Sequence, residues 1–196
     1  MTTEKYTRPT IPTHEEITEE RQRIRRDQAF IKAMRSTVAV LVVVAALAVL
    51  IATLFLPVLQ VAGTSMEPTL EDGDVILLVK TKDFETGDLI GLHYEGKILL
   101  KRVIGGPGDF IFIDKDGTVS VNNVELEEPY VTDKSLGECD ISFPYQVPAD
   151  AYFVLGDHRS VSVDSRSTVV GCIQYEQIIG RVVVRIWPLS ELSWIF

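Results

Sequence analysis

Residues 37–58 carry no charged side chain, and this run limits the possible folds more than any other feature of the chain. It reads TVAVLVVVAALAVLIATLFLPV. An α-helix rises about 1.5 Å per residue, so about 20 apolar residues cross a hydrocarbon core of roughly 30 Å. A helix buried in a soluble domain would carry a polar stripe, and this run shows none. The run therefore predicts a transmembrane helix.

A cleaved secretory signal is the alternative, because Ala62 could end a small-residue cleavage site. The apolar core of such a signal is usually about 7–15 residues long. Its charged leader is also much shorter than the 36 residues that precede this run. The run is therefore interpreted as a retained membrane anchor.

The charges that flank the run predict its orientation. No basic residue follows the run until Lys80, but six lie just before it: Arg21, Arg23, Arg25, Arg26, Lys32 and Arg35. Because positive charge stays on the cytoplasmic side, we expect residues 1–36 to form a cytoplasmic, partly helical segment. Residues 59–196 are then expected to lie outside the cytoplasm.

The net charge of −9, from 28 acidic and 19 basic residues, argues against a nucleic-acid partner, which would select a basic protein. The bases before the span are interleaved with acids, so they are interpreted as a solvated helix. The histidines (His14, His93 and His158) are far apart in the sequence, and the two cysteines lack the paired spacing of a zinc site. We therefore expect no metal and no cofactor.

Residues 59–196 predict a mainly β domain. Short turn signals, such as Glu95-Gly96, Asp116-Gly117 and Asn122-Asn123, separate apolar runs. The runs predicted as strands are Val75–Lys80, Leu89–Tyr94, Ile98–Ile104, Phe110–Ile113, Thr118–Val121, Tyr152–Leu155 and Ile179–Trp187. The expected fold is a single N-terminal transmembrane helix followed by a closed or sandwiched antiparallel β-sheet domain.

The stretch Gly63–Leu70, GTSMEPTL, begins a few residues after the predicted span. Its chemistry is therefore expected to take place near the membrane surface. A serine in a loop of Gly, Thr and Pro is most often a turn residue. Ser65 becomes a nucleophile only where a base takes its proton.

Lys101 is the candidate for that base. Alternate side chains of a strand share a face, so Lys101 is expected to point with Leu99 and Val103, and Arg102 the opposite way. At its ordinary pKa of ~10.4, about one lysine in 2,500 is neutral at pH 7, and burial on an apolar face lowers that pKa. The alternative is a lysine that snorkels at the sheet edge. The Gly-Gly-Pro-Gly run after it lacks the GK[ST] ending of a phosphate loop and is interpreted as a tight turn.

A third stretch, GDHRSVSVDSR at 156–166, is rich in hydrogen-bonding groups and follows an apolar strand. Asp164 and Arg166 are expected to form an ion pair that pins this loop. Ser162 could hydrogen-bond a nearby amine. Such a loop either organises a site or simply caps a sheet.

These stretches resemble bacterial type I signal peptidases, membrane-bound serine proteases that remove signal peptides from exported proteins. The matching segments are SMEPTL at 65–70, KRVIGGPGD at 101–109, and GDHR and SVDSR within 156–166. Each motif alone is weak, but the three occur in the family's order after a single span. The resemblance covers about residues 35–190, and the short segment 114–150 resembles the compact Gram-positive subtype.

The resemblance implies roles for particular residues. It implies that Ser65 is the nucleophile and that Lys101 is its general base. Ser162 would hydrogen-bond the lysine, and Asp164 and Arg166 would support the site. The oxyanion hole would use the backbone N–H of Ser65. A second donor, supplied in some members by a serine hydroxyl two residues earlier, is in doubt because Gly63 stands there. Met66 is expected to help line the substrate pocket.

The sequence departs from the family at His158, where Asn is usual. With Asp157 next to it and Ser65 available, a Ser-His-Asp triad is an alternative. Adjacent residues of an extended loop generally point apart, which argues against an Asp157–His158 pair. We therefore expect Lys101, not His158, to be the base.

The expected function is cleavage of signal peptides from exported preproteins at the outer face of the cytoplasmic membrane. The expected partners are preprotein signal peptides, bound as an added strand through shallow pockets for small side chains, and the lipid bilayer. The main alternative is a membrane-tethered Ser/Lys peptidase with a narrow client set such as pilins. An inactive binding module or a structural envelope protein would not explain both Ser65 and Lys101.

Two features stay open. Cys139 and Cys172 have no motif around them, so a disulfide between them and an ordinary core role for Cys172 are both possible. A sortase-like Cys–His enzyme is disfavoured because no TLxTC-like strand is present. The aromatic tail, residues 187–196, either rests at the membrane interface or packs on the sheet.

Overall fold

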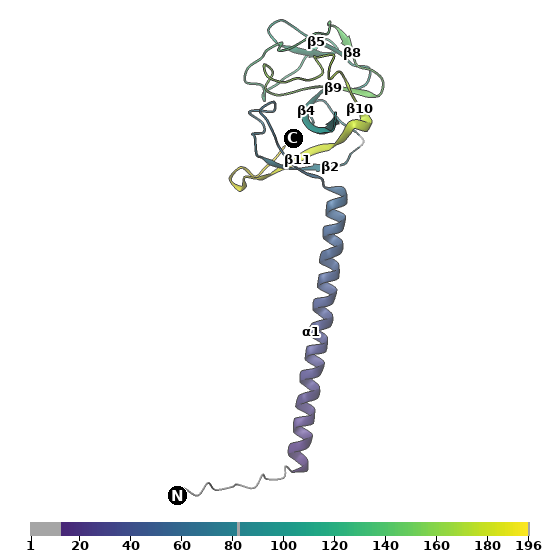
Figure 1. The fold of residues 1–196 in the computed structure, drawn as a ribbon, viewed down its shortest axis with the longest axis vertical. Coiled ribbons are helices and arrows are strands. Elements are labelled where there is room, and N and C mark those ends of the chain that lie inside the picture. The colour runs from purple at the N-terminus through teal and green to yellow at the C-terminus, as the bar shows by residue number, and fades with distance from the viewer. Residues whose placement is uncertain (1–12, 82, 196) are drawn as a thin grey trace. The chain divides into compact units, whose positions relative to one another are not determined.

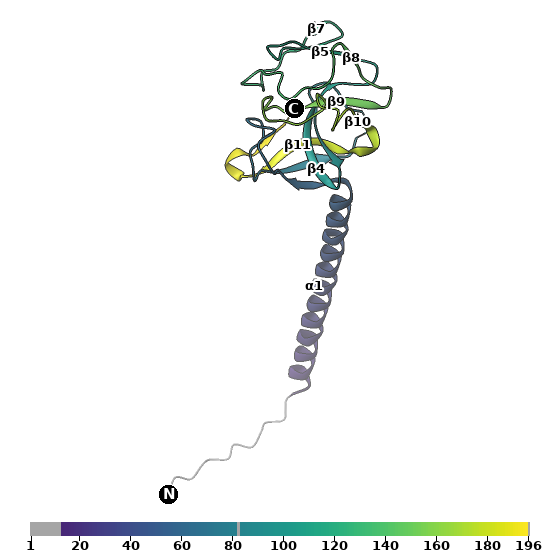
Figure 2. The same ribbon diagram turned by 45° about the horizontal axis from the view of Figure 1, so that its top comes forward.

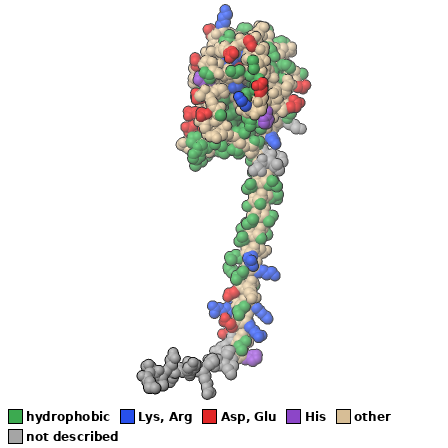
Figure 3. Space-filling view, in the orientation of Figure 1, with side chains coloured by type: hydrophobic (Ala, Val, Ile, Leu, Met, Phe, Trp, Pro, Cys, Tyr) green, Lys and Arg blue, Asp and Glu red, His purple; other side chains and the backbone are tan. Residues whose placement is uncertain are grey.

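The computed structural model describes residues 13–81 and 83–195. Helix α1 (His14–Phe55) runs without a break, as Figure 1 shows. Its charged side chains gather in the N-terminal half, and hydrophobic side chains cover the C-terminal half (Figure 3). Among the described residues, Ile17–Ala52 is the one stretch long and apolar enough to cross a membrane.

The helix and the charge-free run do not end together. The helix ends at Phe55, whereas strand β1 (Val58–Gln60) begins at the last residue of the run. Pro57 explains this boundary, because a proline disfavours helical geometry in the residue before it. Thr53–Phe196 forms a compact unit of its own, separate from Met1–Ala52.

Within residues 58–81 and 83–195, antiparallel strands form two sheets. The larger sheet has the order β1, β2 (Val75–Val79), β11 (Ile178–Trp187), β3 (Leu89–Tyr94), β4 (Lys97–Gly105), β9 (Ala151–Leu155) and β10 (Ile173–Gln174), and β12 (Ser193–Trp194) pairs with β11. The smaller sheet has the order β7 (Val124–Glu125), β6 (Val119–Val121), β5 (Phe110–Ile113) and β8 (Tyr145–Gln146). Two short 3-10 helices, η1 (Tyr175–Gln177) and η2 (Leu189–Glu191), flank β11. Figure 2 shows β5, β7 and β8 on one side of β9, with β4 and β11 on the other.

The mainly β, antiparallel fold class is confirmed. Every strand predicted from the sequence is present, and Leu89–Tyr94 and Phe110–Ile113 have the predicted bounds. The turn signals also hold, since Glu95, Asn122 and Asn123 have positive φ angles of 47°, 53° and 66°. Asparagine tolerates the left-handed region that two-residue hairpin turns need, and Glu95 adopts it next to Gly96.

Hydrophobic packing fixes the segment that carries Ser65. Met66 and Leu70 are fully buried in a cluster with Ile76 and Leu78 of β2. Strand β4 is held by β3 along Lys97–Arg102 and by β9 from Arg102 onward. Both supports of the candidate site therefore belong to the core of the β domain.

Candidate active site

Ser65 lies in a tight turn that directly precedes a buried anchor. The Glu67 N–H donates to the Thr64 carbonyl at 3.2 Å, and the Leu70 N–H donates to the Met66 carbonyl at 3.0 Å. The turn is entered through Gly63, whose φ of +91° lies in a region that glycine adopts without steric cost. Because Met66 is buried, the neighbouring Ser65 is held at the surface of the domain as a partly exposed residue.

The structure brings Lys101 to this turn. Lys101 Nζ lies 3.2 Å from Ser65 Oγ, although 36 residues separate them in the sequence. Lys101 is 3% exposed, so it does not snorkel at an edge. Alternation along β4 puts its side chain on the face opposite that of Arg102, as the sequence predicts.

Burial lowers the pKa of Lys101 below its usual 10.5 and is the largest influence on it. The negative charge of Asp164 raises that pKa, Arg166 lowers it, and Asp157 raises it. Among the described residues Lys101 has no ion pair, so no carboxylate in contact holds its proton. A buried amine without an ionic partner is chemically suited to take a proton from a hydroxyl.

The loop 156–166 is built around a buried ion pair. Asp164 and Arg166 contact through two hydrogen bonds of 2.8 Å, and both side chains are fully buried. Asp164 also accepts from the Gly156 N–H at 3.0 Å, and Arg166 donates to the carbonyls of Arg159 and Ser162. The expected pinning role of this pair therefore has a geometric basis.

Ser162 lies beside the Ser65 turn, with Gly156 between them. A Cβ added to Gly156 would lie 2.3 Å from Ser162 Oγ and 2.6 Å from the Ser65 carbonyl oxygen, so only glycine fits there. Ser162 Oγ is buried and has no hydrogen-bond partner among the described residues. The hydrogen bond to Lys101 that the resemblance implies is thus not formed in this structure.

The two backbone N–H groups considered as oxyanion donors, those of Gly63 and Ser65, are not equally available. The Gly63 N–H donates to the Asp72 carboxylate at 2.7 Å, so it is already engaged. Among the described residues, the Ser65 N–H has no hydrogen-bond acceptor. Of these two N–H groups, the Ser65 N–H is therefore the one that no described residue occupies.

His158 does not form a triad with Asp157. The Asp157 carboxylate binds Arg102 at 2.8 and 2.6 Å and accepts from the Thr69 hydroxyl. The His158 ring instead places Nδ1 3.3 Å from the Thr64 carbonyl and 3.7 Å from the Glu67 carboxylate. Asp157 and His158 thus have different partners, as alternation along the loop predicts, and Asp157 is not placed to orient the imidazole.

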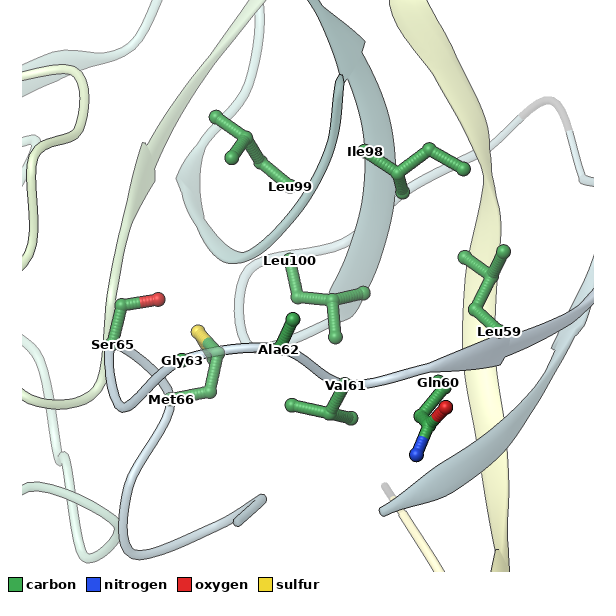
Figure 4. A pocket seen from close by; sticks show the side chains of 10 residues that line it. All are labelled: Leu59, Gln60, Val61, Ala62, Gly63, Ser65, Met66, Ile98, Leu99 and Leu100. Carbon is green, nitrogen blue, oxygen red and sulfur yellow. The ribbon is translucent and has the colours of Figure 1, made fainter. Parts of the chain in front are cut away.

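A small pocket opens beside Ser65, between the segment 59–66 and residues 98–100 of β4 (Figure 4). Its volume is about 110 Å³. Met66 and Gly63 line it near Ser65, and Leu59 and Ile98 lie at its far end. Its walls are mostly apolar, so it suits small apolar side chains.

Sequence reasoning missed the groups that hold the far face of β4. Arg102 is bound by Asp157 and by the Gly87 carbonyl, and it lies 3.8 Å from the centre of the Tyr130 ring. Glu128 and Arg159 form a second buried ion pair that ties the segment around Tyr130 to the loop 156–166. An arginine within an apolar strand is a signal for such a partner, because a buried charge is nearly always paired.

Other candidate features are placed as follows. Cys139 and Cys172 are free thiols, and Cys172 packs against the core near Tyr145. Among the described residues, no group of three or more His, Cys, Asp or Glu could hold a metal ion. Trp187 and Trp194 of the aromatic tail are mostly exposed.

The chain is similar to known peptidases. The family model described as "Signal peptidase, peptidase S26" matches residues 34–187. "Signal peptidase I U" of Bacillus subtilis (strain 168) is 35% identical over 164 residues, which cover 78% of this chain and 87% of that protein. "Signal peptidase I" of Bacillus licheniformis is 33% identical over 190 residues, 90% of this chain and 98% of that protein. A crystal structure of a signal peptidase I from Enterococcus faecalis V583 covers 52% of this chain and 98% of its own, at 29% identity and a TM-score of 0.43.

Proposed function

Since the chain belongs to the signal peptidase family, peptidase S26, we propose that it removes signal peptides from preproteins with a Ser65–Lys101 dyad. The relatives named above support an endopeptidase of the Gram-positive type I kind, and neither name favours a peptidase dedicated to pilins. The observation that carries the dyad is the 3.2 Å contact between the buried Lys101 amine and the Ser65 hydroxyl. A buried amine with a lowered pKa has a neutral form that can accept the hydroxyl proton.

The dyad would catalyse acyl transfer in two steps, formation of an acyl-enzyme and its hydrolysis. Neutral Lys101 takes the proton of Ser65 as Oγ bonds to the scissile carbonyl carbon. The C–N bond then breaks, and the lysine ammonium returns the proton to the leaving amine. A water deprotonated by the same lysine attacks the acyl-enzyme, which releases the signal peptide as an acid and restores the Ser65 hydroxyl.

Charge that develops on the carbonyl oxygen needs a donor. The Ser65 N–H is the donor we assign, because no described residue already occupies it. The Gly63 N–H is held by Asp72 and would have to leave this carboxylate to contribute. We therefore expect a weaker oxyanion hole than one with two preorganised donors.

The remaining loop residues act on the geometry of the dyad. Asp164 and Arg166 fix the backbone of Gly156 and Ser162. Gly156 allows Ser162 to approach the Ser65 turn. We propose that the unpartnered Ser162 hydroxyl turns to Lys101 during the reaction, because no other described group satisfies it.

The substrate would bind as an extended strand beside the pocket. Among the described residues, β1 pairs only with β2, and residues 97–101 of β4 pair only with β3. Two strand edges with free backbone groups therefore flank the pocket next to Ser65. Main-chain hydrogen bonds to such edges do not depend on the side chains of the substrate. The small apolar pocket would therefore supply the preference for small residues before the cut.

The chain is membrane-anchored by α1. We propose that the apolar run spans the bilayer from residue 37 to the end of α1 at Phe55, with residues 1–36 in the cytoplasm and the catalytic β domain, which begins at β1, outside, because the bases lie before the span. Protease added to intact spheroplasts is expected to digest residues 59–196 and to spare residues 1–36. Digestion of the N-terminal segment instead would reverse this orientation.

The decisive experiment uses the full-length protein in detergent and one secretory preprotein. Cleavage products are separated, and the new amino terminus is sequenced. We expect a single cut after a small residue, and no cut by the Ser65→Ala variant. The Ser160→Ala variant, which changes an exposed serine of the neighbouring loop, is the matched control and is expected to cleave. Cleavage by Ser65→Ala would refute the proposed nucleophile.

A further inference from the structure

His158 contacts the turn that carries Ser65 from outside the proposed dyad. Its backbone N–H donates to the Ser65 carbonyl at 3.1 Å. Its ring Nδ1 lies 3.3 Å from the Thr64 carbonyl, which also accepts the Glu67 N–H that closes the turn. The same Nδ1 lies 3.7 Å from the Glu67 carboxylate. One residue thus touches the first, second and fourth residues of the turn.

We propose that His158 is a positioning residue that, together with Glu67, clamps the turn Thr64–Glu67 and holds Ser65 in its reactive orientation. The inference rests on the proposed function of Ser65. Nδ1 can donate to the Thr64 carbonyl only when it carries a proton, which one neutral tautomer lacks and the imidazolium always has. The positive charge of the imidazolium also attracts the Glu67 carboxylate.

Glu67 is the carboxylate in reach of the ring, because the other charged neighbours are engaged elsewhere. Asp157 is bound to Arg102, and Arg159 is bound to Glu128. Lys101 contacts the same turn at the Ser65 hydroxyl. The side chains of His158 and Glu67 are 34% and 38% exposed, so the pair is open to buffer protons and to salt.

Three variants separate the two parts of the clamp. His158→Asn keeps an N–H donor for the Thr64 carbonyl but removes the charge. His158→Phe keeps a ring and removes the donor as well. Glu67→Gln keeps the side-chain length and removes the carboxylate. His93→Asn and Glu71→Gln make the same chemical changes at exposed positions of β3 and of the segment after the turn, and serve as matched controls.

The measurement is kcat and KM of full-length, detergent-solubilised protein on one preprotein at pH 8. Loss of the donor in His158→Phe is expected to lower kcat roughly threefold to tenfold, with KM within about twofold. His158→Asn should recover most of that loss. Glu67→Gln is expected to lower kcat by at most about twofold, because an exposed ion pair contributes little, and to have no further effect in the His158→Phe background.

A His158→Phe variant with the wild-type kcat would overturn the inference. A His158→Phe variant that raises only KM would also overturn it, because it would make His158 a substrate contact. Thermal unfolding of each variant identifies loss of fold, and His158→Asn keeps the test valid if the Phe variant is unstable. Cleavage by Ser65→Ala would refute the proposed function itself, whereas equal kcat values of the wild type and His158→Phe with an inactive Ser65→Ala would refute only the role of His158.

Discussion

Lys101 and Arg102 are neighbours on strand β4 and are equally buried, at 3% exposure each, yet their side chains have different partners. Arg102 has a carboxylate with two hydrogen bonds, a carbonyl and an aromatic ring in contact. Among the described residues, Lys101 contacts one hydroxyl and no carboxylate. Burial alone therefore does not decide what a buried cation does; the partner does.

The contrast explains why one strand can serve both structure and chemistry. A buried charge with a full set of partners stays charged and ties elements together. A buried amine without such partners has a lowered pKa, so a larger fraction of it is neutral and able to accept a proton. The alternation of a strand puts the two environments on opposite faces, one residue apart.

The largest expected effect comes from removing the reactive cation. Lys101→Met keeps the length of the side chain and removes the base, so the preprotein cleavage rate is expected to fall at least about a thousandfold. Lys101→Arg should be equally inactive, because a guanidinium is not deprotonated in proteins. Lys115→Met, at an exposed position of the turn between β5 and β6, is the control and should cleave normally. An active Lys101→Met enzyme would show that Lys101 is not the base.

The next effect concerns stability, and it should have opposite signs at the two positions. Arg102→Met leaves the Asp157 carboxylate buried and unpaired, and is expected to lower the free energy of unfolding by about 3–5 kcal/mol. Lys101→Met removes a buried cation without an ion pair and is expected to leave stability unchanged or to raise it. Thermal unfolding of the detergent-solubilised variants measures both. Equal destabilisation by the two substitutions would show that the ion pair of Arg102 does not distinguish it from Lys101.

The sequence predicted the longer strands because each is an apolar run bounded by turn signals. Strands β1, β7, β8, β10 and β12 have two or three residues each, too few to stand out as such runs. The extent of the charge-free run also did not predict where α1 ends, because Pro57, not the loss of apolar residues, ends the helix.

The same limit applies to the site. Alternation, which is a local pattern, placed Lys101 on a buried face, and the resemblance to signal peptidases implied Ser65 as its partner. The binding of Arg102 by Asp157, 55 residues away, depends on how β4 and the loop 156–166 meet in space. The capture of the Gly63 N–H by Asp72 is likewise a tertiary contact.

A third test uses pH to titrate the unpaired cation. Because the lowered pKa of Lys101 makes the neutral amine the active form, kcat is expected to rise about tenfold per pH unit below that pKa and to level off above it. The plateau should begin below pH 10.5, the usual value for lysine. The activity of Arg102→Lys should keep this profile, since the charge on the far face stays paired with Asp157. A rise that continues to pH 10.5 would show that burial does not tune Lys101.

The lowered pKa also sets the pH dependence of stability. Between the pKa of Lys101 in the folded protein and its higher value in the unfolded chain, the unfolded state binds more protons. The contribution of Lys101 to the free energy of unfolding therefore rises with pH through this window and is constant below it. Lys101→Met should remove that slope, which chemical unfolding at a series of pH values would reveal.

The smallest effect is expected at Ser162, the buried hydroxyl without a partner beside the Ser65 turn. If this hydroxyl turns to Lys101 only during the reaction, Ser162→Ala should change the free energy of unfolding by less than about 0.5 kcal/mol, because no hydrogen bond of the resting protein is lost. The cleavage rate should still fall about fivefold, the value of one hydrogen bond made in the transition state. Ser167→Ala, at a similarly buried serine of the following turn, is the control for cavity effects. A loss of stability that matches the loss of rate would mean that Ser162 supports the fold and not the lysine.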